Sequence, residues 1–212
     1  ALKKFPQNDS RVATVVHNVM DRDSWESRAD LIEKIFGPVD ILVNNAGVGS
    51  SQKLIDVTED EFNFVFDANV RGAFFVAQEV GKRMIARAKG AAPGTYTGGR
   101  IVNVASVAGL RAVANIGVYA MSKAAVVHMT RVMAMEWGKH GINVNALCPG
   151  FIDTDMNHHL WQGEQGQARV EQLPRKRVGQ ASDLDALLVT LCAKESHFIN
   201  GAVISADDGY SV

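Results

Sequence analysis

Three side chains of this sequence combine a hydroxyl, a phenol and an ammonium group at spacings that suit proton transfer. Tyr119 and Lys123 are four residues apart in the run Val-Tyr-Ala-Met-Ser-Lys, so on a helix they share nearly the same face. A lysine ammonium one turn from a phenol stabilises the phenolate, and we expect it to lower the tyrosine pKa toward neutrality. Ser106 ends an apolar run and could hold a substrate oxygen that Tyr119 protonates.

Polar residues also follow two other apolar runs. Asn44-Asn45-Ala46-Gly47 comes after residues 41–43, and Pro149-Gly150 follows residues 142–148, with Thr154 four residues later. Small residues at the end of a strand let a ligand approach the backbone, although Asn and Gly also favour ordinary turns. Asn69 interrupts a helical pattern in which asparagine is a poor former. It is either a tolerated polar residue or a partner of a backbone carbonyl.

Apolar runs of strand length alternate with longer helical patterns. The expected strands cover residues 12–16, 39–43, 101–105, 142–147 and 202–205, and the expected helices cover 23–36, 58–88, 118–139 and 183–194. Thr58 and Glu61 form a capping-box pattern, residues 90–99 read as a long loop, and residues 153–179 as polar with short helices at most. This alternation predicts an α/β fold with a doubly wound parallel sheet.

The composition excludes several classes of function. The 212 residues carry a net charge of −1 and are 47% hydrophobic, so we expect no nucleic-acid or membrane partner. No apolar run approaches the ~20 residues of a membrane span, and the first residues lack the apolar core of a signal peptide. We expect a single domain over residues 1–212 and a cytoplasmic location.

The cysteines and histidines indicate neither a disulfide nor a metal site. Cys148 and Cys192 suit a reducing cytosol, where a bridge between them is not expected. His158 and His159 are adjacent, so on a helix they point about 100° apart and do not share a metal ion.

The polar turns and the tyrosine–lysine pair occur together in the order and spacing of a known family. Over nearly the whole chain the sequence resembles the short-chain dehydrogenase/reductases, through Asn44-Asn45-Ala46-Gly47, Asn69, Ser106, Tyr119-x-x-x-Lys123 and Pro149-Gly150-x-x-x-Thr154. It is most similar to 3-oxoacyl-[acyl-carrier-protein] reductases and 3-hydroxyacyl-thioester dehydrogenases. The resemblance implies a Rossmann-like fold and an NAD(P)-dependent enzyme. Such an enzyme would interconvert a carbonyl and a secondary alcohol, and a 3-oxoacyl thioester would be its substrate.

The resemblance also implies a role for each matching residue. Tyr119 would be the general acid/base, Ser106 would orient the substrate carbonyl, and Asn69 would hold a water in a proton relay. Lys123 would lower the Tyr119 pKa and bind the nicotinamide ribose. NAD or NADP would further contact Asn18, Asn45, Ala46, Gly47, Pro149, Gly150, Ile152 and Thr154, with Asn18 at the adenine and Ile152 and Thr154 at the nicotinamide carboxamide.

Two features depart from the family pattern. The 212 residues contain no Thr-Gly-x-x-x-Gly-x-Gly turn, so we expect a βαβ start of about 30 or more residues to be missing. The expected strand at 12–16 then corresponds to the third strand of the family, and the residues given should bind NAD(P) weakly. Asn18 stands where the family often has an aspartate, but its amide oxygen can still accept a hydrogen bond from adenine.

Two rival interpretations belong to other classes of protein. A non-catalytic, oligomerising remnant of the same fold would keep the catalytic residues but lack the cofactor phosphate site. An extended relative acting on nucleotide sugars shares Tyr-x-x-x-Lys, but the chain leaves no room for a C-terminal substrate domain. We favour the reductase or dehydrogenase, because the full set of catalytic residue types is present.

Two segments lead to expectations about partners and motion. The helical patterns at 118–139 and 58–88 are apolar almost all round, so part of each should be buried by something other than its own sheet. Their pairing about a two-fold axis predicts a homodimer, and the family resemblance implies the same pairing within a homotetramer. Met156, Leu160 and Trp161 recur at helical spacing within residues 155–177. We expect this segment to be a mobile lid over the substrate, with a peripheral surface helix as the alternative.

Overall fold

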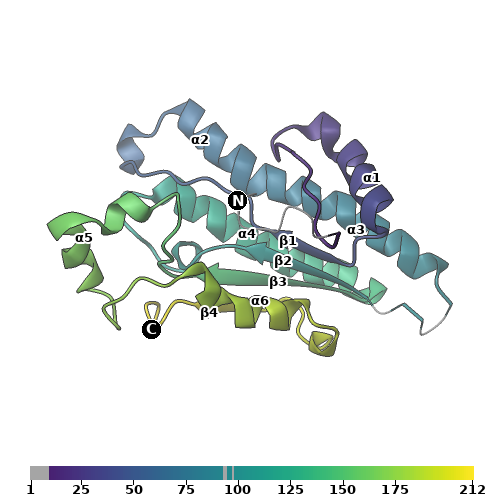
Figure 1. Ribbon diagram of the computed structural model, residues 1–212. Helices are drawn as coiled ribbons and strands as arrows, with labels where there is room; N and C mark the ends of the chain where they lie inside the picture. Colours follow the sequence, from purple (N-terminus) through teal and green to yellow (C-terminus); the bar gives the residue numbers. More distant parts are fainter. Residues whose placement is uncertain (1–9, 93–94, 97) are drawn as a thin grey trace.

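The computed structural model describes residues 10–92, 95–96 and 98–212, and its centre is a parallel β-sheet (Figure 1). The four strands are β1 (Ile41–Asn44), β2 (Gly99–Val104), β3 (Ile142–Pro149) and β4 (Val203–Ala206), and they lie in that order across the sheet. Leu42 pairs with Ile101, Ile101 with Val144, and Leu147 with Ile204. Four of the five expected strands are therefore confirmed.

Residues 12–16, the remaining expected strand, have no regular secondary structure. The side chain of Val16 is 86% exposed, and no described strand pairs with this stretch. A strand is stable only where a neighbour accepts and donates its backbone hydrogen bonds. β-branched residues favour a strand only where a neighbouring strand can pair with them. The prediction was wrong because residues 12–16 have no such neighbour among the described strands.

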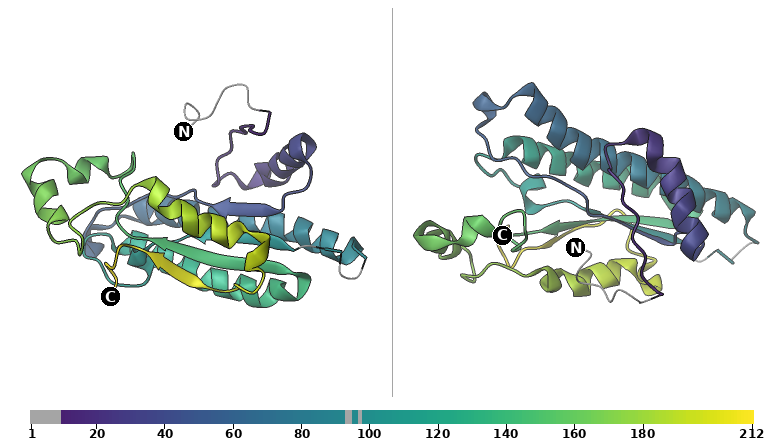
Figure 2. Two further views of the ribbon diagram at one scale, coloured as in Figure 1. Left: turned by 60° about the horizontal axis from the view of Figure 1, so that its bottom comes forward. Right: turned by 45° about the horizontal axis from the view of Figure 1, so that its top comes forward.

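Helices cover both faces of the sheet (Figures 1 and 2). On one face, the helices α3 (Ala73–Gly90) and α4 (Gly117–Trp137) pack on Ile101, Ile142 and Val144. On the other face, α6 (Asp185–Cys192) packs on Val102 and Leu147 through Leu191. The sheet is thus doubly wound, in a Rossmann-like α/β fold. Within the described part of the chain, no helix combines the length and apolar character needed to cross a membrane.

The other helices also follow the expected pattern. The helix α1 (Trp25–Phe36) precedes β1, while α5 (Gly163–Val170) lies in the polar stretch expected to hold short helices. The single helix expected at 58–88 consists of α2 (Glu59–Phe66), a π-helical segment (Asp67–Gly72) and α3. Thr58 caps α2 by accepting the Glu61 amide. The reciprocal half of the capping box is not formed, because the Glu61 carboxylate accepts the Ser50 hydroxyl instead.

Candidate active site

Ser106 lies where β2 has ended and the chain turns toward α4. It precedes a short 3₁₀ turn, Val107–Gly109, where its hydroxyl oxygen accepts the Ala108 amide N–H at 3.1 Å. Gly109 lets this turn lie directly against α4, since a Cβ there would be only 2.7 Å from the carbonyl carbon of Lys123. The sequence analysis did not identify Gly109, because its close contact with α4 is a tertiary one.

Tyr119 and Lys123 lie in the first two turns of α4, as their spacing predicts. Ser106 and Tyr119 line the same cavity, and the Ser106 side chain is a neighbour that lowers the pKa of the Tyr119 phenol. The Lys123 Nζ is 5.7 Å from the centre of the Tyr119 ring and donates to the Val104 carbonyl oxygen at 2.9 Å. The structure therefore brings Ser106, Tyr119 and Lys123 together at the carboxyl end of β2.

The pKa of Tyr119 is raised above its usual value, so the expected net lowering by Lys123 is wrong for this structure. Burial is the largest cause, because the phenolate would lose its hydration, and the Ser106 side chain offsets this effect only in part. Burial also lowers the pKa of Lys123 to about 8. Ser106 is thus the neighbour that favours the phenolate, while the Lys123 ammonium is itself poorly solvated.

Asn69 joins the loop after β1 to α4. Its side chain accepts the Val48 amide at 2.8 Å and donates both to the Val48 carbonyl and to the Ser122 hydroxyl, each at 2.9 Å. Only 1% of Asn69 is exposed. It lies in the π-helical segment, a local geometry that is frequent at functional sites. The amide group therefore has a structural task, and the expected role of Asn69 in holding a water stays a prediction.

The Asn44–Gly47 segment reaches the same place from β1. Asn44 ends the strand and donates to the Ala73 carbonyl and to Asn103, whereas Asn45 and Ala46 are exposed. A Cβ on Gly47 would lie 3.1 Å from Asn69 Oδ1 and 3.4 Å from Lys123 Nζ. Gly47 thus leaves space beside the lysine that a side chain would fill.

The Pro149–Thr154 segment continues from β3 at the carboxyl end of the sheet. The Gly150 amide donates to the Ala206 carbonyl at 3.0 Å. Asn157, which the sequence analysis missed, organises the following turn: its Oδ1 accepts both the amide and the hydroxyl of Thr154, and its Nδ2 donates to the Ile152 carbonyl. A Thr-Asp-x-Asn run is a turn signal that could have indicated this role.

The Asn18 side chain forms its hydrogen bond within its own turn rather than with these residues. It occupies a turn before α1, where its Oδ1 accepts the Met20 amide at 3.0 Å. Within the described ranges, no hydrogen bond joins Asn18 to Ser106, Tyr119 or Lys123. The proposed contact of Asn18 with adenine therefore stays a prediction.

A cavity of about 400 Å³ opens in front of Ser106 and Tyr119. Met156, Leu160 and Trp161 of the expected lid line it, as does Phe151, which follows Gly150. Tyr210 contributes from the turn at the end of the described chain. Sequence reasoning missed Phe151 and Tyr210, because neither belongs to a motif and only the tertiary fold brings Tyr210 to the site.

Comparison with known proteins agrees with this geometry. Residues 2–211 match the family model described as Enoyl-(Acyl carrier protein) reductase. The chain is 34% identical to gluconate 5-dehydrogenase of Gluconobacter oxydans over 209 residues, which cover 98% of this chain and 78% of that protein. It is 36% identical to the 3-oxoacyl-[acyl-carrier-protein] reductase MabA of Mycobacterium tuberculosis over 192 residues, which cover 91% of this chain and 74% of that protein.

Solved structures of dehydrogenases are also similar to this chain. A gluconate 5-dehydrogenase from Burkholderia cenocepacia, in complex with NADP and tartrate, superposes with a TM-score of 0.84 at 31% identity. The match covers 92% of this chain and 74% of that one. The chain therefore spans about three quarters of the length of these relatives.

Proposed function

This chain belongs to the short-chain dehydrogenase/reductase family and is an NAD(P)-dependent oxidoreductase, and we propose that it interconverts a 3-oxoacyl thioester and its secondary alcohol. One observation supports this most strongly. Ser106 and Tyr119 line the same cavity, which is large enough for a small substrate, and Lys123 Nζ lies 5.7 Å from the centre of the Tyr119 ring. The non-catalytic remnant would keep these residues too, but the open cavity in front of them favours an enzyme.

The residues around Lys123 fit a nicotinamide cofactor. The space that Gly47 leaves beside Lys123 Nζ lies at the carboxyl end of the parallel sheet, where such folds bind ligands. Lys123 would hold the ribose there, with Asn45 and Ala46 along the cleft and Pro149 and Gly150 opposite. Ile152 and Thr154 would meet the carboxamide. We leave the choice between NAD and NADP open.

The side chains divide the proton chemistry between them. When bound, the cofactor supplies or accepts the hydride at the carbonyl carbon. Ser106 donates a hydrogen bond to the carbonyl oxygen and orients it, and Tyr119 gives its proton to that oxygen as negative charge develops. Because burial raises the Tyr119 pKa, the phenol is protonated before reduction. In the opposite direction, the phenolate takes the proton from the alcohol.

Replacing the phenol hydroxyl tests this assignment. In the intact protein, we expect Tyr119→Phe to lower kcat by about 10²–10⁴ fold, because only the acid/base group is lost. The matched control is Tyr96→Phe, at a tyrosine outside the cavity whose hydroxyl has no hydrogen-bond partner among the described residues. Steady-state kinetics with either cofactor and circular dichroism measure activity and fold. If Tyr119→Phe kept more than about a tenth of the wild-type kcat, Tyr119 would not be the acid/base group.

A further inference from the structure

Three aromatic side chains from separate parts of the chain form one wall of the cavity. Phe151 is central: its ring centre is 5.5 Å from that of Trp161 and 4.8 Å from that of Tyr210. The ring planes meet at 77° and 72°, which is the edge-to-face packing that aromatic pairs prefer. Val113 and Ile116 add to the apolar lining. We call Phe151, Trp161 and Tyr210 the aromatic wall.

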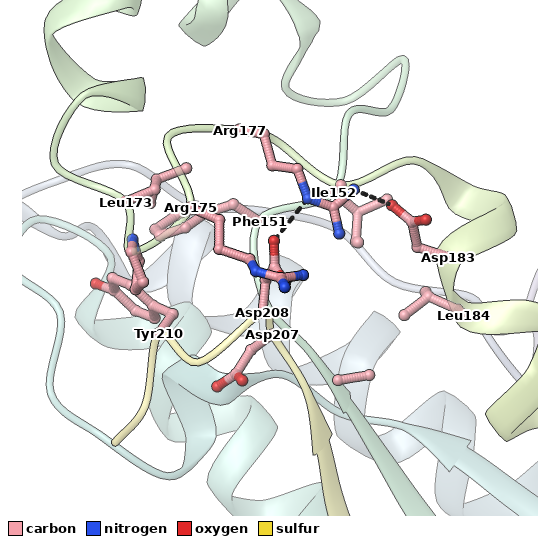
Figure 3. Close-up of a pocket in the computed structure, with 13 residues that line it drawn as sticks. Phe151, Ile152, Leu173, Arg175, Arg177, Asp183, Leu184, Asp207, Asp208 and Tyr210 are labelled. Atoms are coloured by element: carbon pink, nitrogen blue, oxygen red, sulfur yellow. Dashed lines mark hydrogen bonds and ion pairs between the residues drawn. The ribbon is translucent and has the colours of Figure 1, made fainter.

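The chain holds the Tyr210 edge of this wall in place. The Arg111 guanidinium lies over the Tyr210 ring, 4.5 Å from its centre, and also donates to the Tyr210 carbonyl. Two residues earlier, Asp208 accepts hydrogen bonds from Arg175 at 3.1 Å and Arg177 at 2.7 Å. Figure 3 shows Arg175 and Arg177 beside Asp208, with Tyr210 on one side and Asp183 on the other. The turn that carries Tyr210 is thus tied to two other segments.

These contacts also use the hydrogen-bond donors of the nearby arginines. Arg111, Arg175 and Arg177 are each bonded to a group of the C-terminal turn, and none of them lines the cavity. Among the described residues that line it, there is no lysine, arginine, aspartate or glutamate. His159 is the one basic side chain among the described lining residues, and it is exposed, where an ion pair would be worth little. The cavity has no built partner for a substrate carboxylate.

We propose that the aromatic wall seats an apolar carbon chain of the substrate, so that the enzyme selects neutral carbonyl compounds with an alkyl or aryl group over polyhydroxylated sugar acids. This inference rests on the proposed function and narrows its substrate class. The proposed substrate differs from the one in the name of gluconate 5-dehydrogenase. Sequence identity alone does not make this distinction, because the chain is 34% identical to that protein and 36% identical to MabA.

The physical basis is the transfer of apolar surface from water to the wall. Each methylene that becomes buried contributes about threefold to fourfold in binding. In contrast, a sugar acid would bring a carboxylate into a cavity whose described lining contains no lysine or arginine to pair with it, which opposes binding. The value of kcat/KM should therefore rise with the length of the apolar chain until the cavity is filled.

A substrate series with the wild-type protein tests this directly. We would measure kcat/KM of the intact enzyme for methyl 3-oxoesters with acyl chains of increasing length, and for 5-dehydrogluconate. We expect a rise of at least about tenfold over the first four added methylenes, and the sugar acid below the longest ester. A flat series with all esters reduced would overturn the inference while leaving the proposed reaction standing. A preference for 5-dehydrogluconate would overturn the inference and the 3-oxoacyl assignment, and would leave only the carbonyl reduction. If no ketone reacted at all, the proposed function would fail and this inference with it.

Variants of the wall identify the residues responsible. Trp161→Ala and Tyr210→Ala should each reduce the dependence of kcat/KM on chain length by half or more. Tyr210→Leu keeps apolar bulk and should retain most of that dependence, which guards against a folding defect in the alanine variant. The matched control is Phe198→Ala, because Phe198 is 94% exposed and lies outside the cavity. An unchanged dependence in both alanine variants would mean that the aromatic wall does not seat the chain.

Discussion

Lys123 is buried as an ammonium group, and this has a measurable effect on stability. Only 6% of the residue is exposed, and its pKa falls to about 8. In the unfolded chain the usual lysine pKa of about 10.4 applies. Below pH 8 the folded protein therefore bears the full cost of burying the charge. As the pH rises from about 8 to 10.4, the unfolded state holds more protons, and stability rises.

We predict that this effect appears in the cofactor-free protein when it is compared with Lys123→Met. The free energy of unfolding of the wild type, minus that of the variant, should increase by about 2 kcal/mol between pH 7 and pH 10. Denaturant titrations at several pH values measure it. Subtracting the variant removes the titration of groups that do not interact with Lys123, whereas Cys148, which interacts with it, contributes to the difference. A difference that stays constant with pH would show that Lys123 keeps an ordinary pKa.

The sequence identified the reacting side chains but not their electrostatic state. A spacing of four residues on a helix is a local property, so Tyr119 and Lys123 could be placed together with Ser106. The pKa of Tyr119 depends on the balance between burial, which raises it, and Ser106, which lowers it. The packed site sets this balance, and burial has the larger effect. Phe151 and Tyr210 were missed for a related reason, since only the tertiary fold brings their rings together. Asn157 differs, because its contacts with Ile152 and Thr154 are local and its turn signal was overlooked.

At the scale of elements, the approach of the Ser106 turn to α4 depends on Gly109. A side chain there would collide with the backbone of Lys123, which cannot move without shifting the helix. We predict that Gly109→Ala destabilises the protein by about 1–3 kcal/mol. It should also lower kcat by at least about tenfold, because small displacements at a catalytic site are costly. Thermal unfolding and steady-state kinetics measure the two effects.

Gly90→Ala provides the matched control for that substitution. Gly90 ends α3, and a Cβ there would meet nothing within 4 Å. Alanine should leave activity unchanged and increase stability by up to about 1 kcal/mol, since glycine in a helix carries an entropic cost. Equal behaviour of the two variants would argue that the turn can move away from α4 without effect.

The segment from residue 155 to 177 is expected to act as a lid. It contains the short turn His158–Trp161 and the helix α5, and Met156, Leu160 and Trp161 line the cavity. We predict fast hydrogen exchange here in the free enzyme and slower exchange once cofactor and substrate are bound, because closure excludes water. Exchange measured by mass spectrometry tests this, with the buried strand β3 as internal reference. Equal protection in both states would identify a peripheral surface helix instead.

The order of the elements could be predicted from the sequence because strand-length apolar runs alternate with helical patterns. Residues 142–147 are apolar at most positions, and they form a strand buried on both faces. The exception, residues 12–16, has the same β-branched character but no described partner strand. The register of the strands and the π-helical segment at Asp67–Gly72 could not be predicted from the sequence, since both depend on how neighbouring elements pack.

At the scale of the whole molecule, an open apolar groove lies between α4 on one side and α2 and α3 on the other. It has a volume of about 1020 Å³ and is lined by Phe62, Phe66, Val70, Phe74, Met129 and Val132, among others. Several of these side chains are substantially exposed, including Phe62 at 39% and Phe74 at 37%. The apolar outer faces expected from the sequence are thus present, and we propose that a second copy of the chain covers them.

A substitution at Val132 tests whether a second copy of the chain covers the groove. It faces outward with 36% exposed, whereas Met129 also packs against the core. We predict that Val132→Glu dissociates the oligomer, because a buried interface of ~2,000 Å² or more cannot accept an unpaired carboxylate. Sedimentation at micromolar concentration measures the state. The control is Val189→Glu, at a residue of α6 that is 66% exposed and lies on the other side of the sheet, which should leave the oligomer intact. A wild-type protein that sediments as a folded monomer would contradict the proposal, because the groove would then be stable in water.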